Sequence, residues 1–291
     1  MATGVIAKAL SGFYYIHDAG KTVSCRAKGR FRHDGMSPLV GDRVEYSLVS
    51  ETEGVLERIL PRKNSFIRPA VANIDAMVFV ACGAKPVTDP FLIDRVAVIA
   101  DNVGCEMIVC INKCDLNPAD ELYQIYRSCG FQTVRTSALT GEGIEDLRAA
   151  IRGKICAFTS NSGAGKSSLL NALKPDLCLE TGEISDKLGR GKHTTRHVEF
   201  FPLDDSTLAA DTPGFASFEV EMVDNIEPEQ LQNRFMEFTP YLDGCRFTDC
   251  RHLNEPDCAV LQAVAEGKIP RSRHESYAKL YGIIKDHKPW D

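Results

Sequence analysis

The amino-acid sequence predicts a three-domain protein: a small N-terminal β-barrel, a central α/β domain, and a small, mostly helical C-terminal domain that binds metal. Its 291 residues exceed what a single core of typical size organises. Near Ile74, short alternating segments give way to strands that alternate with helices. Beyond about Ile226 the strands stop, and polar helical stretches surround a cluster of cysteines and a histidine. We therefore place the domains at residues 1–70, 71–225 and 226–291.

The overall composition is that of a globular protein, with 44% hydrophobic and 25% charged residues. No apolar run approaches the ~20 residues that span a bilayer, and the start, MATGVIAKALSGFYY, lacks the features of a secretory signal. We therefore expect a cytoplasmic monomer without a membrane partner, whose eleven cysteines are reduced. The net charge of −6 argues against indiscriminate coating of nucleic acid, although one domain can still carry a local basic surface.

Residues 1–70 contain short alternating segments and turn residues without a long amphipathic helix, which predicts a small antiparallel barrel. Four cations recur there at every second position: Arg26, Lys28, Arg30 and Arg32. On a strand this spacing places all four on one face. Because such a face neutralises phosphates and small five-stranded barrels commonly bind RNA, these are our candidate RNA-binding residues. The alternative is a merely solvated strand face.

The central domain is predicted from strands and helices that alternate as far as Asp211. The predicted strands are 76–82, 106–111, 133–136, 154–159 and 207–210. The predicted helices are 90–102, a stretch from 119, 144–152 and 166–173. This alternation implies a parallel sheet and hence one α/β domain.

A glycine-rich loop joins the predicted strand 154–159 to the helix 166–173, which is the context that a phosphate-binding loop requires. Its candidate nucleotide-binding residues are Ser160, Asn161, Ser162, Gly163, Ala164, Gly165, Lys166, Ser167 and Ser168. Lys166 can reach the β- and γ-phosphates, and the Ser167 hydroxyl can ligate Mg²⁺. Ser160 stands where such loops usually begin with glycine, so its backbone must avoid a glycine-only conformation. A plain glycine-rich turn is the alternative.

A second motif distinguishes GTP from ATP and directly follows the predicted strand 106–111: Asn112, Lys113, Cys114 and Asp115. The Asp115 carboxylate can accept from guanine N1–H and N2–H₂, a pair of donors that adenine does not present, and Lys113 can lie along the base. After a further strand, Ser137 and Ala138 resemble the other guanine-contacting loop. Each run is weak alone, but beside a phosphate loop they predict a guanine-nucleotide site.

The run Asp211-Thr212-Pro213-Gly214 resembles the GTPase loop whose Asp lies next to the Mg²⁺ ligands and whose Gly N–H contacts the γ-phosphate. A simple Pro-Gly turn is the alternative. Between this loop and the phosphate loop lies the glycine-rich segment 189–195, which we interpret as a mobile switch. Within it Thr195 is our candidate second Mg²⁺ ligand, and Thr194 is the competing choice.

The order of these loops is rotated. The guanine-reading loops at 112 and 137 precede the phosphate loop at 160, whereas ordinary GTPases have them after it, so the pattern predicts a circularly permuted P-loop GTPase domain. Phe215 stands where Ras-like GTPases carry the water-orienting glutamine, so we expect slow basal hydrolysis that a partner accelerates. Our candidate catalytic residues are His193, Thr195 and Lys166, although His193 could instead be a solvent-exposed loop histidine.

A metal site is predicted in the tail from the spacing C-x4-C-x-H-x5-C, formed by Cys245, Cys250, His252 and Cys258. Three thiolates and an imidazole suit tetrahedral Zn²⁺ and leave no open catalytic position, so the site is interpreted as structural. Reduced cysteines that merely cluster are the alternative. Seven others are expected in the core: Cys25, Cys82, Cys105, Cys110, Cys129, Cys156 and Cys178.

Over essentially the whole chain these motifs resemble the bacterial ribosome small-subunit-dependent GTPase A family (RsgA, or YjeQ-type). The resemblance rests on NKCD, SAL, SGAGKSS, GRGKHTT and DTPG in permuted order and on the cysteine spacing of the tail. It implies an OB-like barrel, one structural Zn²⁺, and Mg²⁺-dependent hydrolysis of GTP to GDP. It also implies binding to the small (30S) ribosomal subunit and 16S rRNA in late maturation, with stimulation of hydrolysis by the subunit.

Two other functions fit parts of the same pattern. One is a GTP-sensing, RNA-binding switch whose hydrolysis is too slow to matter, which turnover measurements with and without small subunits would distinguish. The other is an ATP-dependent RNA remodelling enzyme, which Asp115 disfavours because its carboxylate would lack donors on adenine.

Overall fold

The N-terminal part of the chain is a closed barrel with the strand order β1-β2-β3-β5-β4. The structure is a computed structural model that describes residues 1–28, 31, 37–66, 69–179, 198–211 and 226–286. The barrel strands are β1 (Ala2–Leu10), β2 (Phe13–Asp18), β3 (Lys21–Ala27), β4 (Arg43–Leu48) and β5 (Glu53–Ile59). Neighbours are antiparallel except β3 and β5, which run parallel. The OB-like barrel is confirmed. One of its strand pairs is parallel, whereas the sequence predicts an antiparallel barrel.

A six-stranded sheet in the order β10-β9-β8-β11-β13-β12 forms the centre of the molecule. Its strands are β8 (Ala76–Cys82), β9 (Glu106–Asn112), β10 (Gln132–Arg135), β11 (Ile155–Ser160), β12 (Phe200–Pro202) and β13 (Leu208–Asp211). All pairs are parallel except β12 with β13. Every residue of β8 is buried, as expected for a central strand whose two faces are both covered.

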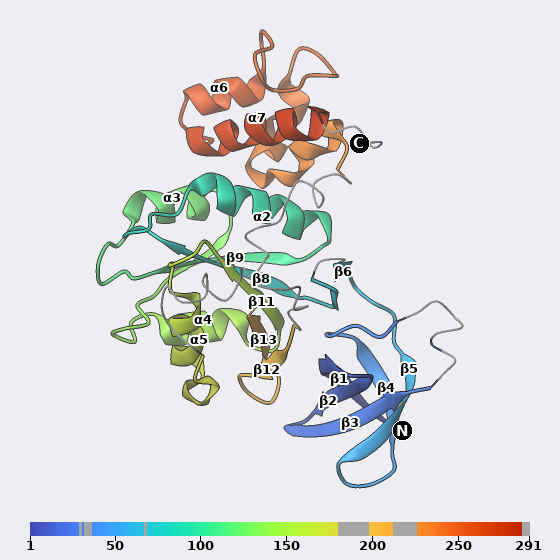
Figure 1. Ribbon diagram of the computed structural model, residues 1–291. Helices are drawn as coiled ribbons and strands as arrows, with labels where there is room; N and C mark the ends of the chain where they lie inside the picture. The colour runs from blue at the N-terminus through green and yellow to red at the C-terminus, as the bar shows by residue number, and fades with distance from the viewer. Residues whose placement is uncertain (29–30, 32–36, 67–68, 180–197, 212–225, 287–291) are drawn as a thin grey trace.

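Helices cover both faces of this sheet. They are α2 (Pro90–Asn102), α3 (Asp120–Ser128), α4 (Ile144–Ile151) and α5 (Lys166–Leu173), followed by the 3-10 turn η1 (Pro175–Leu177). Figure 1 shows α2 and α3 on one face of the sheet and α4 and α5 on the other. A short hairpin joins the barrel to the sheet and consists of β6 (Ser65–Phe66) and β7 (Val71–Ala72). The predicted α/β domain is thereby confirmed.

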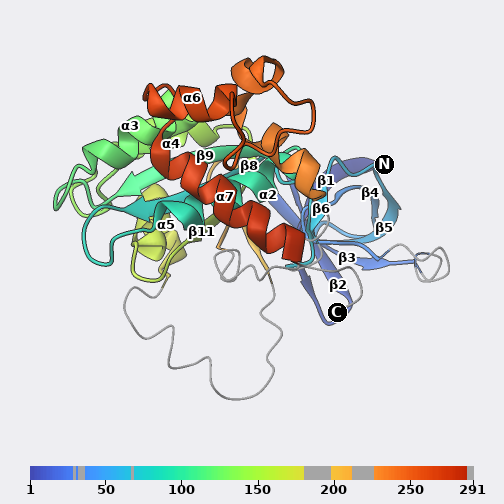
Figure 2. The same ribbon diagram turned by 90° about the horizontal axis from the view of Figure 1, so that it is seen from above.

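The C-terminal body is helical over its described residues. It contains the 3-10 helices η4 (Pro228–Arg234) and η5 (Met236–Gly244) and the α-helices α6 (Ala259–Ala265) and α7 (Arg271–Asp286). Figure 2 shows α7 running over α2, and these two helices contact each other. The helical domain therefore lies on the α2 face of the central sheet.

A buried ion-pair cluster joins these two domains. Arg273 of α7 donates to Asp94 of α2 at 2.6 Å and to Glu237 of η5 at 2.6 Å. The Arg273 and Asp94 side chains are both 0% exposed, and Tyr126 donates its hydroxyl to Asp94 at 2.7 Å. The ring of Phe235 lies 4.6 Å from the guanidinium carbon. We call Asp94, Glu237 and Arg273 the interdomain ion-pair cluster.

The barrel contacts the other side of the central domain, near the end of the sheet formed by β12. Lys8 of β1 pairs with Glu199 as an isolated antiparallel bridge, and the two side chains form an ion pair at 2.7 Å. In Figure 1 the barrel lies beside β12, opposite the helical domain. The sheet is therefore held between two attached domains.

Two expectations about local structure are wrong. Cys178 is exposed rather than in the core, because it follows the turn η1 at the surface with a φ of 47°. The cationic strand also ends early: β3 stops at Ala27, so Arg26 lies on the strand and Lys28 lies beyond it. Within the described residues, none of the helices has the length and apolar character needed to cross a membrane.

Candidate functional site

The phosphate loop leaves β11 and enters α5, as the sequence predicts. Gly163 and Gly165 have φ angles of 80° and 91°, in the region that favours glycine. A Cβ on Gly165 would lie 2.5 Å from Asn112 Nδ2, so this position has no room for a side chain. Ser160 has no positive φ and pairs with Val80 as the last residue of β11, so a side chain is compatible with the backbone there.

The guanine-reading motif contacts the phosphate loop directly. Asn112 Nδ2 donates to the carbonyl of Ala164 at 3.0 Å, and Lys113 Nζ donates to the carbonyl of Gly163 at 2.7 Å. Carbonyl and amide groups of one trans peptide point in opposite directions. Holding the Ala164 carbonyl on Asn112 therefore turns the N–H of Gly165 to the other side of the loop. The Gly165 N–H is thereby directed to the side where an anion can bind, as expected at the start of a helix.

The second guanine loop lies beside Asp115. The Ser137 hydroxyl donates to Asp115 Oδ1 at 2.5 Å, and the N–H of Ala138 donates to Asn112 Oδ1 at 3.1 Å. Asp115 retains a second carboxylate oxygen that can accept from a base. The motifs at 112–115 and 137–138, separated in sequence, therefore meet at the carboxyl ends of β9 and β10, where ligands of parallel sheets commonly bind.

Lys166, the first residue of α5, forms an ion pair with Asp211 at the end of β13. Burial lowers the pKa of the Lys166 ammonium to about 8, whereas the adjacent Asp211 carboxylate acts in the opposite direction. The first residue of the fourth motif therefore lies beside the phosphate loop. Ser167 and Ser168 are in the first turn of α5. His193, Thr194, Thr195, Gly214 and Phe215 lie outside the described residues.

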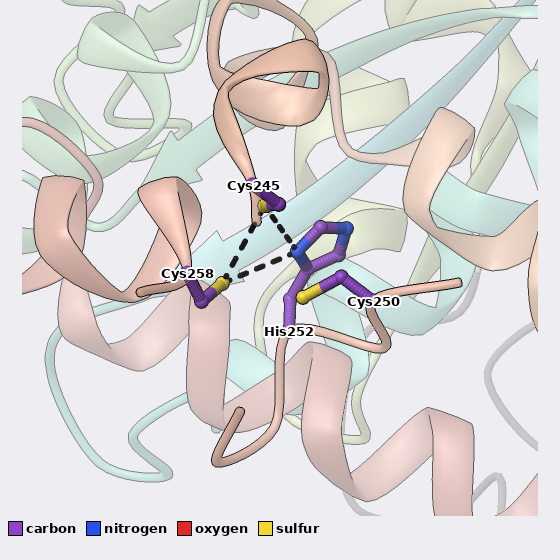
Figure 3. Close-up of side chains that lie close together, drawn as sticks. All are labelled: Cys245, Cys250, His252 and Cys258. Atoms are coloured by element: carbon purple, nitrogen blue, oxygen red, sulfur yellow. Dashed lines mark hydrogen bonds between the residues drawn. The ribbon is translucent and has the colours of Figure 1, made fainter. Parts of the chain in front are cut away.

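The four predicted metal ligands come together at one point (Figure 3). Their ligand atoms all lie within 4.8 Å of one another: Cys245 Sγ, Cys250 Sγ, His252 Nδ1 and Cys258 Sγ. Cys245 and Cys258 have sulfur atoms 3.8 Å apart, and His252 Nδ1 lies 3.5 and 3.3 Å from them. Tetrahedral Zn²⁺ with bonds of ~2.3 Å to sulfur and ~2.1 Å to nitrogen requires separations of about 3.8 and 3.6 Å. The donor set therefore fits zinc.

A glutamine that no sequence motif marks orients the histidine of the predicted metal site. Gln232 Oε1 in η4 lies 2.6 Å from His252 Nε2, so this nitrogen carries the proton and Nδ1 is free to bind metal. Burial also lowers the pKa of His252, which favours the neutral ring that a metal requires. His274 donates from Nε2 to the His252 carbonyl at 2.7 Å. Gln232 lies 20 residues before His252, and no motif marks it.

The candidate RNA-binding residues are only partly described. Arg26 is exposed, with its guanidinium carbon 4.6 Å from the centre of the Phe13 ring, and Lys28 forms an ion pair with Glu57 of β5. Arg30 and Arg32 lie outside the described residues. The structure thus places one cation–aromatic pair and one partly neutralised lysine on the barrel surface.

The fold and site together define a circularly permuted P-loop GTPase, in which the guanine-reading loops precede the phosphate loop. The family model described as "RsgA GTPase" matches residues 59–221, and that described as "RsgA N-terminal domain" matches residues 3–56. The chain belongs to the RsgA GTPase family and hydrolyses GTP.

Similar proteins match along almost their full length. A protein of Caldanaerobacter subterraneus named "Small ribosomal subunit biogenesis GTPase RsgA" is 46% identical, covering 97% of this chain and 96% of its own. A Geobacillus protein of the same name is 45% identical, with 99% of each covered. The crystal structure of YjeQ from Thermotoga maritima has a TM-score of 0.84 at 35% identity, covering 99% of both chains. That of YloQ, described as a circularly permuted GTPase, has a TM-score of 0.81 at 36% identity, covering 99% of this chain and 96% of its own.

Proposed function

We propose that this GTPase binds the small (30S) ribosomal subunit and its 16S rRNA during late maturation, and that the subunit stimulates GTP hydrolysis. The observation that carries the proposal is the full-length similarity to proteins named for small-subunit biogenesis, which includes all three domains rather than the nucleotide domain alone. The protein acts in the cytoplasm as a monomer.

Within this function we assign the nucleotide roles as follows. Asp115 accepts from the guanine base and is held in place by Ser137, while the loop at 160–168 holds the phosphates. Lys166 exchanges the Asp211 carboxylate for the β- and γ-phosphates, and Ser167 ligates Mg²⁺. Thr195 completes the Mg²⁺ site, Gly214 contacts the γ-phosphate, and His193 assists the attack of water.

One structural zinc ion occupies the cluster in the helical domain. Four protein ligands complete its tetrahedral coordination and leave no position for a substrate. The ion holds the loop between η5 and α6, which contains few apolar residues of its own and would otherwise be poorly ordered.

The barrel contacts rRNA through its cations Arg26, Lys28, Arg30 and Arg32. Within the described part of the chain, Arg26 forms no ion pair with an acidic side chain. Its guanidinium lies over the Phe13 ring, which orders it in advance of binding. A phosphate would compete with Glu57 for Lys28. Several such contacts release counterions from the RNA and make binding steeply dependent on salt.

The test is GTP turnover measured against a titration of purified small subunits, with Arg26→Glu compared with Lys21→Glu. Both residues are exposed cations of β3, so the two variants change the charge equally at opposite ends of one strand. We expect subunits to raise wild-type turnover, and Arg26→Glu to weaken subunit binding and flatten its salt dependence more than Lys21→Glu. Unchanged turnover with saturating subunits contradicts stimulation, and equal effects of the two variants contradict a specific RNA-binding face.

A further inference from the structure

Thr88 lies beside the phosphate loop but belongs to none of the nucleotide motifs. It sits in the segment between β8 and α2, two residues before Pro90, where α2 begins, and it is 2% exposed. A buried hydroxyl needs an acceptor for its proton and a donor for a lone pair. The partners of Thr88 come from two segments of the chain that are far apart in sequence.

The hydrogen bonds of Thr88 fix the orientation of Asn161. Thr88 Oγ1 accepts from the N–H of Cys82 at 2.8 Å and donates to Asn161 Oδ1 at 2.7 Å. The N–H of Thr88 also donates to the Cys82 carbonyl at 2.9 Å. Cys82 is the last residue of the buried central strand β8. The Asn161 side chain is therefore connected through Thr88 to the end of the buried central strand.

Asn161 is the residue at which the phosphate loop departs from β11. Its carbonyl accepts from the N–H of Ala164 at 3.3 Å, which closes the turn that contains Gly163. Its other side-chain contact, from Nδ2 to the Ser162 carbonyl, is long at 3.5 Å and stays within the loop. The bond to Thr88 is thus the side-chain contact that ties the start of this turn to the sheet.

The phosphate loop is consequently held at three points. Asn112 and Lys113 hold its second half through the carbonyls of Ala164 and Gly163. Thr88 holds its first half through Asn161. We infer that Thr88 is a positioning residue for nucleotide binding, because it keeps the phosphate loop in its binding conformation before a nucleotide arrives.

Such pre-ordering strengthens binding because the loop does not have to lose its freedom when the ligand binds. The inference rests on the proposed role of this loop in holding the phosphates. It assigns to Thr88 a contribution to the affinity for both GTP and GDP, since the bond orders the loop as a whole and not the site of one phosphate.

The test compares Thr88→Val with Thr88→Ser. Valine keeps the shape of threonine and removes the hydroxyl, whereas serine keeps the hydroxyl. The dissociation constants and dissociation rates of fluorescent GDP and of a non-hydrolysable GTP analogue are measured for each. For a neutral hydrogen bond we expect Thr88→Val to weaken both ligands by about 3- to 10-fold, mainly through faster dissociation. Thr88→Ser should stay close to the wild type.

A second variant separates positioning from loss of fold, because Thr88→Val also deprives the buried Cys82 N–H of its partner. Asn161→Ala leaves the bonds between Thr88 and Cys82 intact, and it should weaken both ligands to a similar extent. In the double variant the losses should not add, since both substitutions remove the same bond. Additive losses, or a Thr88→Ser variant as weak as Thr88→Val, overturn the inference. A wild-type protein that binds neither ligand would instead contradict the proposed nucleotide site itself.

Discussion

The burial of the interdomain ion-pair cluster allows us to predict how much stability the protein loses when Arg273 is replaced. Arg273→Met keeps most of the side-chain volume and removes the charge. The variant leaves the Asp94 carboxylate, 0% exposed, and the Glu237 carboxylate, 5% exposed, without the cation that both contact at 2.6 Å. Removing one partner of a buried ion pair costs more than the pair contributes, because the remaining charge stays out of water.

We expect a loss of about 3–5 kcal/mol in the free energy of unfolding for this substitution. The upper half of this range is favoured because two carboxylates lose their partner, although Tyr126 still donates to Asp94. For a cooperative unit of roughly 150–250 residues, a loss of about 4 kcal/mol lowers the melting temperature by about 8–16 °C.

The loss should also depend on pH. Burial raises the pKa of the Asp94 carboxyl, and Arg273 lowers it. In the variant, burial still raises this pKa, but the opposing effect of Arg273 is lost. Its folded state then binds a proton more tightly than its unfolded state, and stability is regained as the pH falls through the raised pKa. The difference in melting temperature between wild type and variant should therefore be larger at about pH 8 than at about pH 5.

Calorimetry of the zinc-loaded protein measures both effects. Arg271→Met is the matched control, because Arg271 lies on the same helix with a side chain that is 86% exposed. The triple variant Arg273→Met, Asp94→Asn, Glu237→Gln should recover part of the loss by removing the unpaired charges. If Arg273→Met melts at the same temperature as Arg271→Met, the cluster does not stabilise the molecule and the reasoning fails.

Two further substitutions address the two candidate sites. Asp115→Asn should weaken GTP binding by about 10- to 100-fold and favour xanthine nucleotides. A competition assay between GTP and xanthine nucleotides measures this change. An unchanged preference for GTP would contradict the guanine-reading role. Gln232→Ala should lower zinc affinity by about 10- to 100-fold in a chelator competition, because His252 loses the partner that fixes its proton. The exposed neighbour Gln230 provides the control, and Gln230→Ala losing zinc equally would exclude this role.

Much of the central domain could be predicted because its signals are local. The predicted helices 90–102 and 166–173 agree with α2 and α5 to the residue. Asp89 caps α2 and Pro90 begins it, while Gly165 at 91° starts α5, so each helix start is marked in the sequence. The cluster of candidate metal ligands could also be predicted, because its four residues lie within one short segment.

The positioning residues could not be predicted, because their partners are distant in sequence. Thr88 and Asn161 are separated by 73 residues, and Arg273 and Asp94 by 179. Neither pair has a motif, and only the tertiary fold brings them together. The end of the cationic strand could not be predicted for a related reason. A period of two is compatible with a strand, but it does not show where pairing with β2 and β5 ends.

The contact between Lys8 and Glu199 has a consequence for the association of separate chains. Strand β12 lies at the edge of its sheet, and an edge strand offers unpaired N–H and C=O groups to strands of other molecules. The barrel, which as a closed sheet has no edge of its own, covers this side by pairing β1 with Glu199 next to β12. We therefore expect that a chain lacking its first 60 or so residues exposes more of the β12 edge to β-pairing with other molecules.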